Sequence, residues 1–188
     1  MIISAERLNL RPWNDADRMS FVDMSVDPEV MEFMMPLKRE AASGAWIDDQ
    51  IAHQKAHGFC FWAVERKEDL RFIGTVGLRR IGYEADFTPA VEIGWRIARP
   101  FWGNGYAPEA ASAAIQFGFK ILKLPEIIAI TVPHNLKSRR VMEKLGMQRD
   151  EDGDFDHPLV KKGHPLRRHV LYRLRRDEWN RKREVSDV

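Results

Sequence analysis

Cysteine is almost absent from this chain, and long apolar segments are missing altogether. Cys60 is the single cysteine among 188 residues, so neither an internal disulfide nor a cysteine-based metal site is expected, in agreement with a reducing cytoplasm. No uninterrupted apolar run approaches the roughly 18 residues that cross a bilayer, and the amino terminus lacks the basic-then-apolar order of a secretory signal. We therefore expect a soluble cytoplasmic protein with no membrane partner.

An excess of charge of one sign is also lacking. The 30 basic residues nearly balance the 28 acidic ones, which leaves a net charge of +2. A balance of this kind does not indicate general affinity for nucleic acid. Basic residues gather only in the stretch RRHVLYRLRRDEWNRKRE near the carboxyl terminus, a pattern more typical of a solvated face than of an RNA-binding patch. Nucleic acid is therefore not expected as a partner.

What the sequence does contain is the composition of a globular domain. Hydrophobic residues make up 44% of the chain and charged residues 31%, and no repeat or linker-like tract divides it. A chain of this length buries roughly 70% of the surface that its unfolded form exposes. We expect one domain over residues 1–188.

The periodicity of apolar residues places helices and strands along the chain. After an opening strand in LNLRPW, helices are expected over 14–27, 27–34 and 39–58, the first capped by Asn14 and the last ended by Gly58. Three strands follow over 59–65, 71–81 and 90–98, and consecutive strands of this kind suggest antiparallel pairing. The first third is thus mostly helical, and a sheet begins in the middle of the chain.

The second half alternates between the two periods. A helix with a face of small residues begins near Gly105, and the run 126–132 is apolar enough for a strand covered on both faces. A second helix begins near Asn135 and ends at Gly146, and 167–174 is expected to be the closing strand. The mixed charges and turn residues between 147 and 166 predict a long hairpin connection.

The segment RPFWGNGYAPEA, residues 99–110, joins the third strand to the helix with small residues. Strand, Gly-Asn-Gly and helix together favour an anion site, because glycine lets the backbone approach a ligand and the helix presents unpaired N–H groups. It is not a Walker loop, since no Lys-Ser or Lys-Thr follows, and Pro108 stands where the dinucleotide fingerprint needs its third glycine. Taken alone, the segment is better interpreted as a turn before a well-capped helix.

A second motif lies about thirty residues downstream. The pair WRIARPFWGNGYAPEAASAAI and TVPHNLKSRRVMEKLGM resembles the paired motifs of the GCN5-related N-acetyltransferase (GNAT) superfamily. The order of helices and strands along most of the chain is similar as well. Within the superfamily, the EIGW, WGNGYA and NLKS motifs look most like those of the ribosomal-protein N-terminal acetyltransferases. The resemblance implies an α+β fold, with a mixed, mostly antiparallel sheet of about six to seven strands and helices on both faces.

The resemblance also implies acetyl-CoA as co-substrate and assigns residues to it. The amides of the glycine loop would bind the pyrophosphate, because backbone donors and a helix dipole suffice without lysine. The preceding strand would pair its backbone with the pantetheine arm. The residues so implied are Trp95, Arg96, Ile97, Trp102, Gly103, Asn104, Gly105, Tyr106 and Ala107.

The second motif has a structural and a functional interpretation. Asn135 suits a helix N-cap, and Ser138 an ordinary polar position in the first turn. The resemblance implies instead that Asn135 bonds the cofactor arm and that Ser138 lies near the departing thiolate, to which it could donate a proton. Many superfamily members use a tyrosine acid seven residues after the asparagine, but this chain has Met142 there. The acid is therefore expected to be Ser138 or water.

The incoming amine must lose a proton, and a carboxylate on the central strand is the simplest base. Glu92 is the candidate, against the alternative of a polar residue at a solvated strand edge, and His134 is a lesser one. Aromatic residues at core-like spacing could instead line an acceptor cleft: Trp13, Trp46, Trp62 and Phe87.

These residues predict an acetyl-CoA-dependent N-acetyltransferase in which a primary amine attacks the thioester directly, without metal. The acceptor could be a protein N-terminus or a small amine such as an amino sugar, polyamine or antibiotic. The alternatives are a non-catalytic CoA-binding module and a structural domain whose glycine loop is only a turn. A homodimer is consistent with the resemblance, as an analogy between folds.

Overall fold

The computed structural model describes the main chain of residues 1–35 and 39–186, and the side chains of residues 1–35 and 44–181. Eight strands of a mixed sheet and six α-helices lie in this part of the chain. The chain divides into two compact units, described separately below: Met1–Arg79 with Gly94–Ala114, and Arg80–Ile93 with Ile115–Val188. The α+β class is confirmed, whereas the expected number of strands was too low.

Strands of the first unit pair with their neighbours in sequence. β1 (Ile3–Ser4), β2 (Leu8–Arg11), β3 (Phe61–Arg66) and β4 (Phe72–Arg80) are successive antiparallel partners. β1 was not expected, because two residues are too few to show a period. Cys60, just before β3, is fully buried, and burial raises the pKa of its thiol to about 12. It is a core side chain and not a nucleophile.

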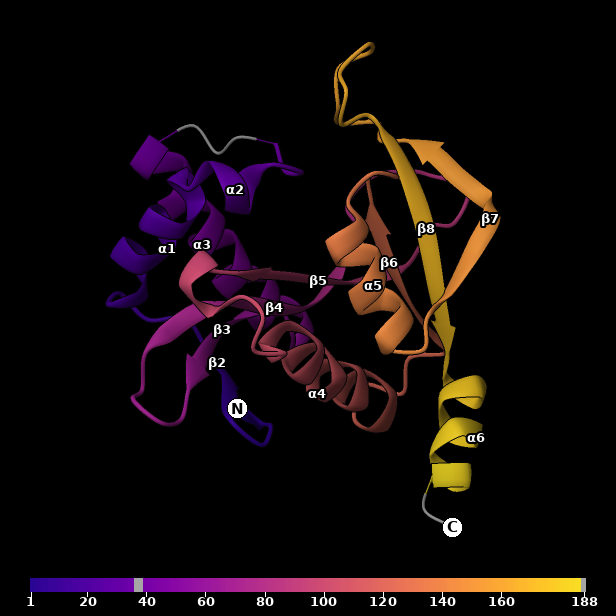
Figure 1. Ribbon diagram of the computed structural model, residues 1–188, viewed down its shortest axis with the longest axis horizontal. Coiled ribbons are helices and arrows are strands. Elements are labelled where there is room, and N and C mark those ends of the chain that lie inside the picture. Colours follow the sequence, from indigo (N-terminus) through magenta and orange to yellow (C-terminus); the bar gives the residue numbers. More distant parts are fainter. Residues whose placement is uncertain (36–38, 187–188) are drawn as a thin grey trace. The chain divides into compact units, whose positions relative to one another are not determined.

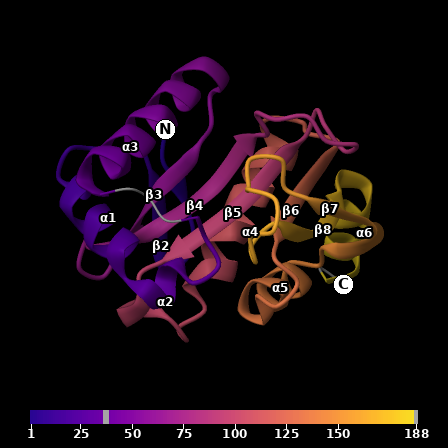
Figure 2. The same cartoon turned by 90° about the horizontal axis from the view of Figure 1, so that it is seen from above.

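Three helices of the first unit lie together on one side of β2 to β4 (Figures 1 and 2). They are α1 (Asp17–Val26), α2 (Pro28–Met31) and α3 (Arg39–His57). Asp27 caps α2 by accepting a hydrogen bond from the Glu29 amide, and Gly58, at φ 82°, ends α3. Aromatic rings fill the space between helices and strands: Trp46 stacks on Phe21 at 4.7 Å and Phe21 meets Trp13 edge-on at 5.4 Å.

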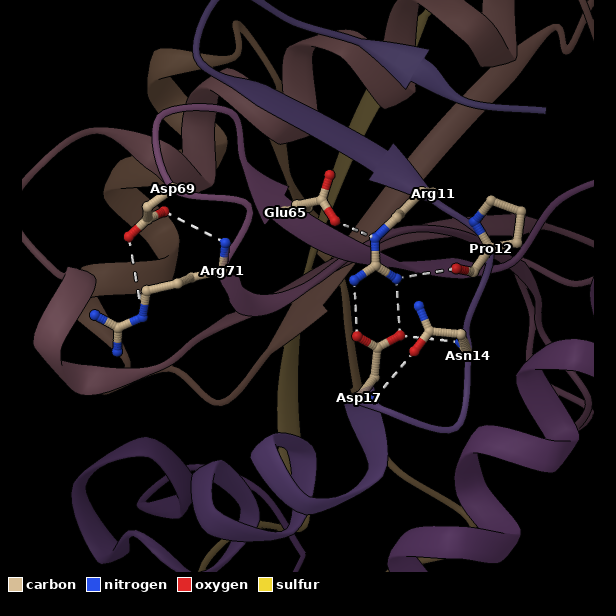
Figure 3. A network of polar contacts seen from close by, with 7 residues as sticks. All are labelled: Arg11, Pro12, Asn14, Asp17, Glu65, Asp69 and Arg71. Atoms are coloured by element: carbon tan, nitrogen blue, oxygen red, sulfur yellow. Dashed lines mark hydrogen bonds and ion pairs between the residues drawn. The ribbon is translucent and has the colours of Figure 1, made fainter.

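A charged network ties α1 to the strands of the first unit (Figure 3). The Arg11 guanidinium donates two hydrogen bonds of 2.8 Å to Asp17 and one of 2.7 Å to Glu65. Asn14 was expected as the cap of α1, but Ala16 occupies the N-cap position and caps with no side-chain bond. The Asn14 side-chain oxygen nevertheless accepts from the main-chain amide of Asp17, and the main-chain amide of Asn14 donates to the Asp17 carboxylate. Asp17 is only 2% exposed, so its charge depends on Arg11 for compensation.

The second unit is built around β6 (Glu126–Thr131). β6 runs parallel to β5 (Val91–Ile97), with Glu92 opposite Ile128, and antiparallel to β8 (Arg168–Arg175). β8 pairs on its other side with β7 (Gln148–Asp156). Two helices follow strands of this unit, α5 (Leu136–Lys144) and α6 (Arg176–Ser186), while α4 (Tyr106–Lys120) begins in the first unit and ends in the second.

The expectation of a loop from 147 to 166 was wrong over its first part, because β7 occupies 148–156. Its sequence, QRDEDGDFD, has no apolar alternation, and most of its side chains are exposed or half-buried. The strand is held by main-chain pairing with β8, which is interrupted between Asp150 and Phe155. Charged side chains are typical of an edge strand, where they discourage pairing with other molecules.

None of the helices in the described part of the chain is both long and apolar enough to span a bilayer.

Candidate active site

The glycine loop of the first unit is held by its own side chains. A short 3-10 helix, η1 (Arg99–Phe101), follows β5 and leads into it. The Trp102 indole donates to the Ile97 carbonyl at 2.6 Å, and the Asn104 amide donates to the carbonyls of Phe101 and Trp102 at 3.1 Å each. These contacts fix the path of the loop between β5 and α4. They also bring the predicted loop residues to the end of the strand that carries Trp95, Arg96 and Ile97.

Both glycines of the loop adopt left-handed backbone conformations. Gly103 has φ 79° and Gly105 has φ 76°, values that favour glycine. A β-carbon added to Gly103 would meet no atom within 4 Å, so open space lies beside this residue. Glycine is needed here for the path of the backbone, and it leaves room for a ligand.

The main-chain N–H groups of residues 103–107 belong to the same loop as this open space at Gly103. Among the described residues, none of these five amides has a hydrogen-bond acceptor. They include the start of α4, where the helix has positive dipole character. A cluster of unpaired amides at a helix start matches the anion site expected from the sequence, and its chemistry fits a pyrophosphate.

Arg7 lies beside the loop, which the sequence did not indicate. Its guanidinium pairs with Glu109 at 2.7 Å, its main-chain amide donates to the same carboxylate, and it lies 4.7 Å from the centre of the Tyr106 ring. A β-carbon on Gly105 would be 3.6 Å from the Arg7 guanidinium. Arg7 is separated from Glu109 by 102 residues, and no local pattern could have revealed this contact.

The second motif lies in the second unit, where Asn135 caps α5. Its side-chain oxygen accepts from the Ser138 amide at 3.2 Å, and its side-chain nitrogen donates to the Thr131 hydroxyl at 3.0 Å. The structural interpretation of Asn135 is therefore correct, although an amide side chain retains further bonding capacity. The half-buried Ser138 makes no side-chain hydrogen bond within the described residues. Met142 is 1% exposed, which is the environment of a core side chain.

Glu92 lies half-buried on β5, opposite Ile128 of β6. Because β6 pairs with β5 at this position, Glu92 does not lie at an open edge of the sheet on the β6 side. Burial raises the pKa of Tyr83 above its ordinary value, and the negative charge of Glu92 raises it further. The Tyr83 hydroxyl is buried without a hydrogen-bond partner in the described residues. Tyr83 was not among the residues singled out from the sequence. His134, the lesser candidate for the base, is exposed.

The four aromatic candidates for an acceptor cleft are divided between the two units. Trp62 is 1% exposed and belongs to the core. Trp13 and Trp46 lie 5.8 Å apart in the first unit, where Trp46 is half-buried. Phe87 belongs to the second unit and meets Phe155 edge-on at 4.8 Å.

Histidines join this aromatic group in the second unit. His157 lies 4.6 Å from the Tyr83 ring and 5.0 Å from the His169 ring. Burial lowers the pKa of His157 to about 4, helped by the charge that His169 would carry, and burial also lowers the pKa of His169. Both rings are therefore held in their neutral form.

We expect the stability of the protein to fall as the pH drops from about 6.5 to about 4. In this window the unfolded chain binds a proton at His157, whose ordinary pKa is 6.5, while the folded protein does not. The melting temperature, measured across this pH range, should change more steeply with pH in the wild type than in His157→Phe. The control is His164→Gln, which changes another histidine between β7 and β8 and should keep the wild-type slope of melting temperature against pH. A wild-type slope in His157→Phe would contradict the prediction.

Comparison with known proteins supports the motifs. The family described as "Acetyltransferase (GNAT) domain" matches residues 7–148. YkkB, an uncharacterized protein of Bacillus subtilis, is 33% identical over 143 residues, which cover 76% of this chain and 82% of that protein. A GNAT-family acetyltransferase from Bacillus anthracis has a similar structure, with a TM-score of 0.78 and 27% identity over 95% of this chain and all of that one.

The ribosomal-protein branch is also represented among the structural neighbours. A ribosomal-protein-S5-alanine acetyltransferase from Vibrio fischeri matches with a TM-score of 0.74 and 20% identity, over 95% of this chain and 98% of that one. At this identity the match shows a shared fold. The family match covers both motifs and extends into both units, and the two loop glycines adopt the left-handed conformations that suit the motif. The chain therefore belongs to the GNAT family of acetyl-CoA-dependent N-acetyltransferases.

Proposed function

We propose that the five amides of residues 103–107 bind the pyrophosphate of acetyl-CoA, and that the backbone of residues 95–97 binds its pantetheine arm. The observation that carries this proposal is the set of unpaired amides beside the open space at Gly103. Backbone donors aimed at one point bind phosphate well because the helix dipole adds to them. Arg7, although paired with Glu109, adds a guanidinium next to Gly105.

The proposed reaction is the direct transfer of an acetyl group to a primary amine. Acetyl-CoA supplies a thioester whose carbonyl carbon accepts the amine. Glu92 takes the proton that the amine loses, directly or through water, and Ser138 or water gives a proton to the departing sulfur. A main-chain N–H of the preceding strand would polarise the carbonyl oxygen. The acceptor is a protein N-terminus or a small amine, and the cytoplasmic location and a homodimer stay predictions.

The binding half of the proposal is tested by Gly103→Leu. A leucine side chain would occupy the open space in front of the amides, so the acetyl-CoA dissociation constant should rise about 100-fold, the equivalent of about 2.7 kcal/mol. Isothermal titration calorimetry with acetyl-CoA measures this change. Failure of the wild-type protein to bind acetyl-CoA would refute the proposed function.

Gly58→Leu is the matched control. Gly58 has φ 82°, close to the 79° of Gly103, and a β-carbon at either position meets nothing within 4 Å. Both substitutions should therefore cost the same backbone strain, about 1–2 kcal/mol. Equal losses of acetyl-CoA affinity in both variants would mean that strain, and not the loop, explains the effect.

A further inference from the structure

A buried arginine in the first unit has no charged partner among the described side chains. Arg96 on β5 is 8% exposed, and no described carboxylate pairs with its guanidinium. Its Nε is buried without a hydrogen-bond partner, and its Nη1 donates to the Ser25 hydroxyl at a long 3.4 Å. Burial lowers the pKa of Arg96 to about 10, so the group still carries its charge at neutral pH.

The described surroundings of Arg96 position its guanidinium but do not neutralise its charge. The centres of the Phe21 and Trp46 rings lie 5.5 and 5.7 Å from its central carbon. Aromatic faces attract a cation, but this attraction is weaker than the free-energy cost of burying an ion. The rings also accept no conventional hydrogen bond from Nε. Two acidic side chains of the neighbouring helices are paired elsewhere, Asp17 with Arg11 and Glu29 with Arg99. An uncompensated buried charge of this kind is suited to an anionic ligand.

The direction of the Arg96 side chain restricts the kind of anion that it can bind. Successive side chains of a strand point to opposite faces, and that of Arg96 points toward α1 and α3, which supply Phe21, Ser25 and Trp46. The loop amides at 103–107 already provide for the pyrophosphate under the proposed function. Arg96 therefore provides for a different anion, bound next to the strand that holds the acetyl donor.

We propose that Arg96 binds a carboxylate of the amine acceptor, so that the acceptor class is small amines bearing a carboxylate, such as amino acids. This inference rests on the proposed function and specifies its acceptor. A guanidinium offers parallel donors that match the two oxygens of a carboxylate. The half-buried Trp46 lies at the same place, where its ring can pack against an apolar part of the acceptor.

The test compares amino acids with their primary amides, using phenylalanine and methionine, whose amides carry no carboxylate. The kcat/KM for acetylation is measured for each acid and its α-amide, with wild type, Arg96→Met and Arg96→Lys. The ratio of acid to amide should fall about tenfold or more in Arg96→Met and less in Arg96→Lys. Intrinsic differences in amine reactivity cancel, because the same pair of compounds is compared in each variant. Arg18→Met, which removes a half-buried arginine of α1 that is paired with the exposed Asp48, should keep the wild-type ratio.

A second measurement needs no variant. The amine-free 3-phenylpropionate should inhibit the wild-type enzyme at least tenfold more strongly than 3-phenylpropionamide, in competition with the amine. Equal ratios in wild type and Arg96→Met, or equal inhibition by the two compounds, would overturn the role of Arg96. So would the absence of acetylation across the acids while acetyl-CoA binds. Loss of acetyl-CoA binding in the wild type would instead refute the proposed function on which the inference rests.

Discussion

Replacing Glu92 with glutamine is expected to lower kcat/KM for acetyl transfer by about 10²–10⁴-fold, the range typical of losing a general base. Glutamine keeps the size and polarity of the side chain but cannot accept the proton of the incoming amine. The dissociation constant of acetyl-CoA should stay within about twofold, because the proposed phosphate site lies on the loop at 103–107. Steady-state kinetics and calorimetry on the same preparation separate the two effects.

The matched control is Glu151→Gln, since Glu151 is an exposed carboxylate on β7 in the same unit. Its kcat/KM should equal that of the wild type. The pH profile of kcat/KM gives a further check. In a base-catalysed reaction kcat/KM falls toward acid pH, because the base becomes protonated. This fall should disappear in Glu92→Gln and persist in Glu151→Gln. Wild-type activity in Glu92→Gln would remove Glu92 as the base and leave water or His134 to take the proton.

Replacing Arg11 with methionine is expected to destabilise the protein by about 3–5 kcal/mol, the usual cost of leaving a buried charge without its partner. Methionine keeps most of the length of the arginine stem, so the loss would come from the hydrogen bonds to Asp17 and Glu65. Asp17 is 2% exposed and would have to keep its charge unpaired or bind a proton. Urea denaturation at pH 7 measures the free energy of unfolding.

Two further variants give this stability test its contrast. Arg18→Met removes an arginine whose partners, Asp15 and Asp48, are largely exposed, and should cost about 0–1 kcal/mol. The double variant Arg11→Met with Asp17→Leu removes both buried charges and should recover part of the loss. A cost below about 1 kcal/mol for Arg11→Met alone would show that the network does not stabilise the fold as its geometry indicates.

The elements that the sequence predicted well are those in which local pattern and tertiary environment agree. The strands around Cys60 and Glu92 carry apolar runs, and the helix after Gly105 has both a stripe of small residues and a proline in its first turn. The glycine loop was predictable for the same reason, because its backbone requirement is local. Positive φ values at Gly103 and Gly105 agree with that interpretation.

Features that depend on distant partners could not be predicted. β7 has no strand pattern of its own and exists through its pairing with β8. The sequence left two interpretations of Asn135 open, and its capping bond to Ser138 became visible only in the structure. For Arg96, the sequence implied a backbone role, whereas the burial of its side chain among Phe21 and Trp46 depends on the packing of α1 and α3.

The contact between Arg7 and Glu109 has a consequence for how the protein is made. During synthesis at about 5–20 residues per second, about 5–20 s pass between the addition of Arg7 and that of its partner 102 residues later. Until Glu109 is made, Arg7 has no carboxylate of α4 to pair with, and contacts of such long range also slow folding after synthesis. The glycine loop at 103–107, which leads into α4, is therefore expected to be among the later parts of the first unit to become ordered in a nascent chain.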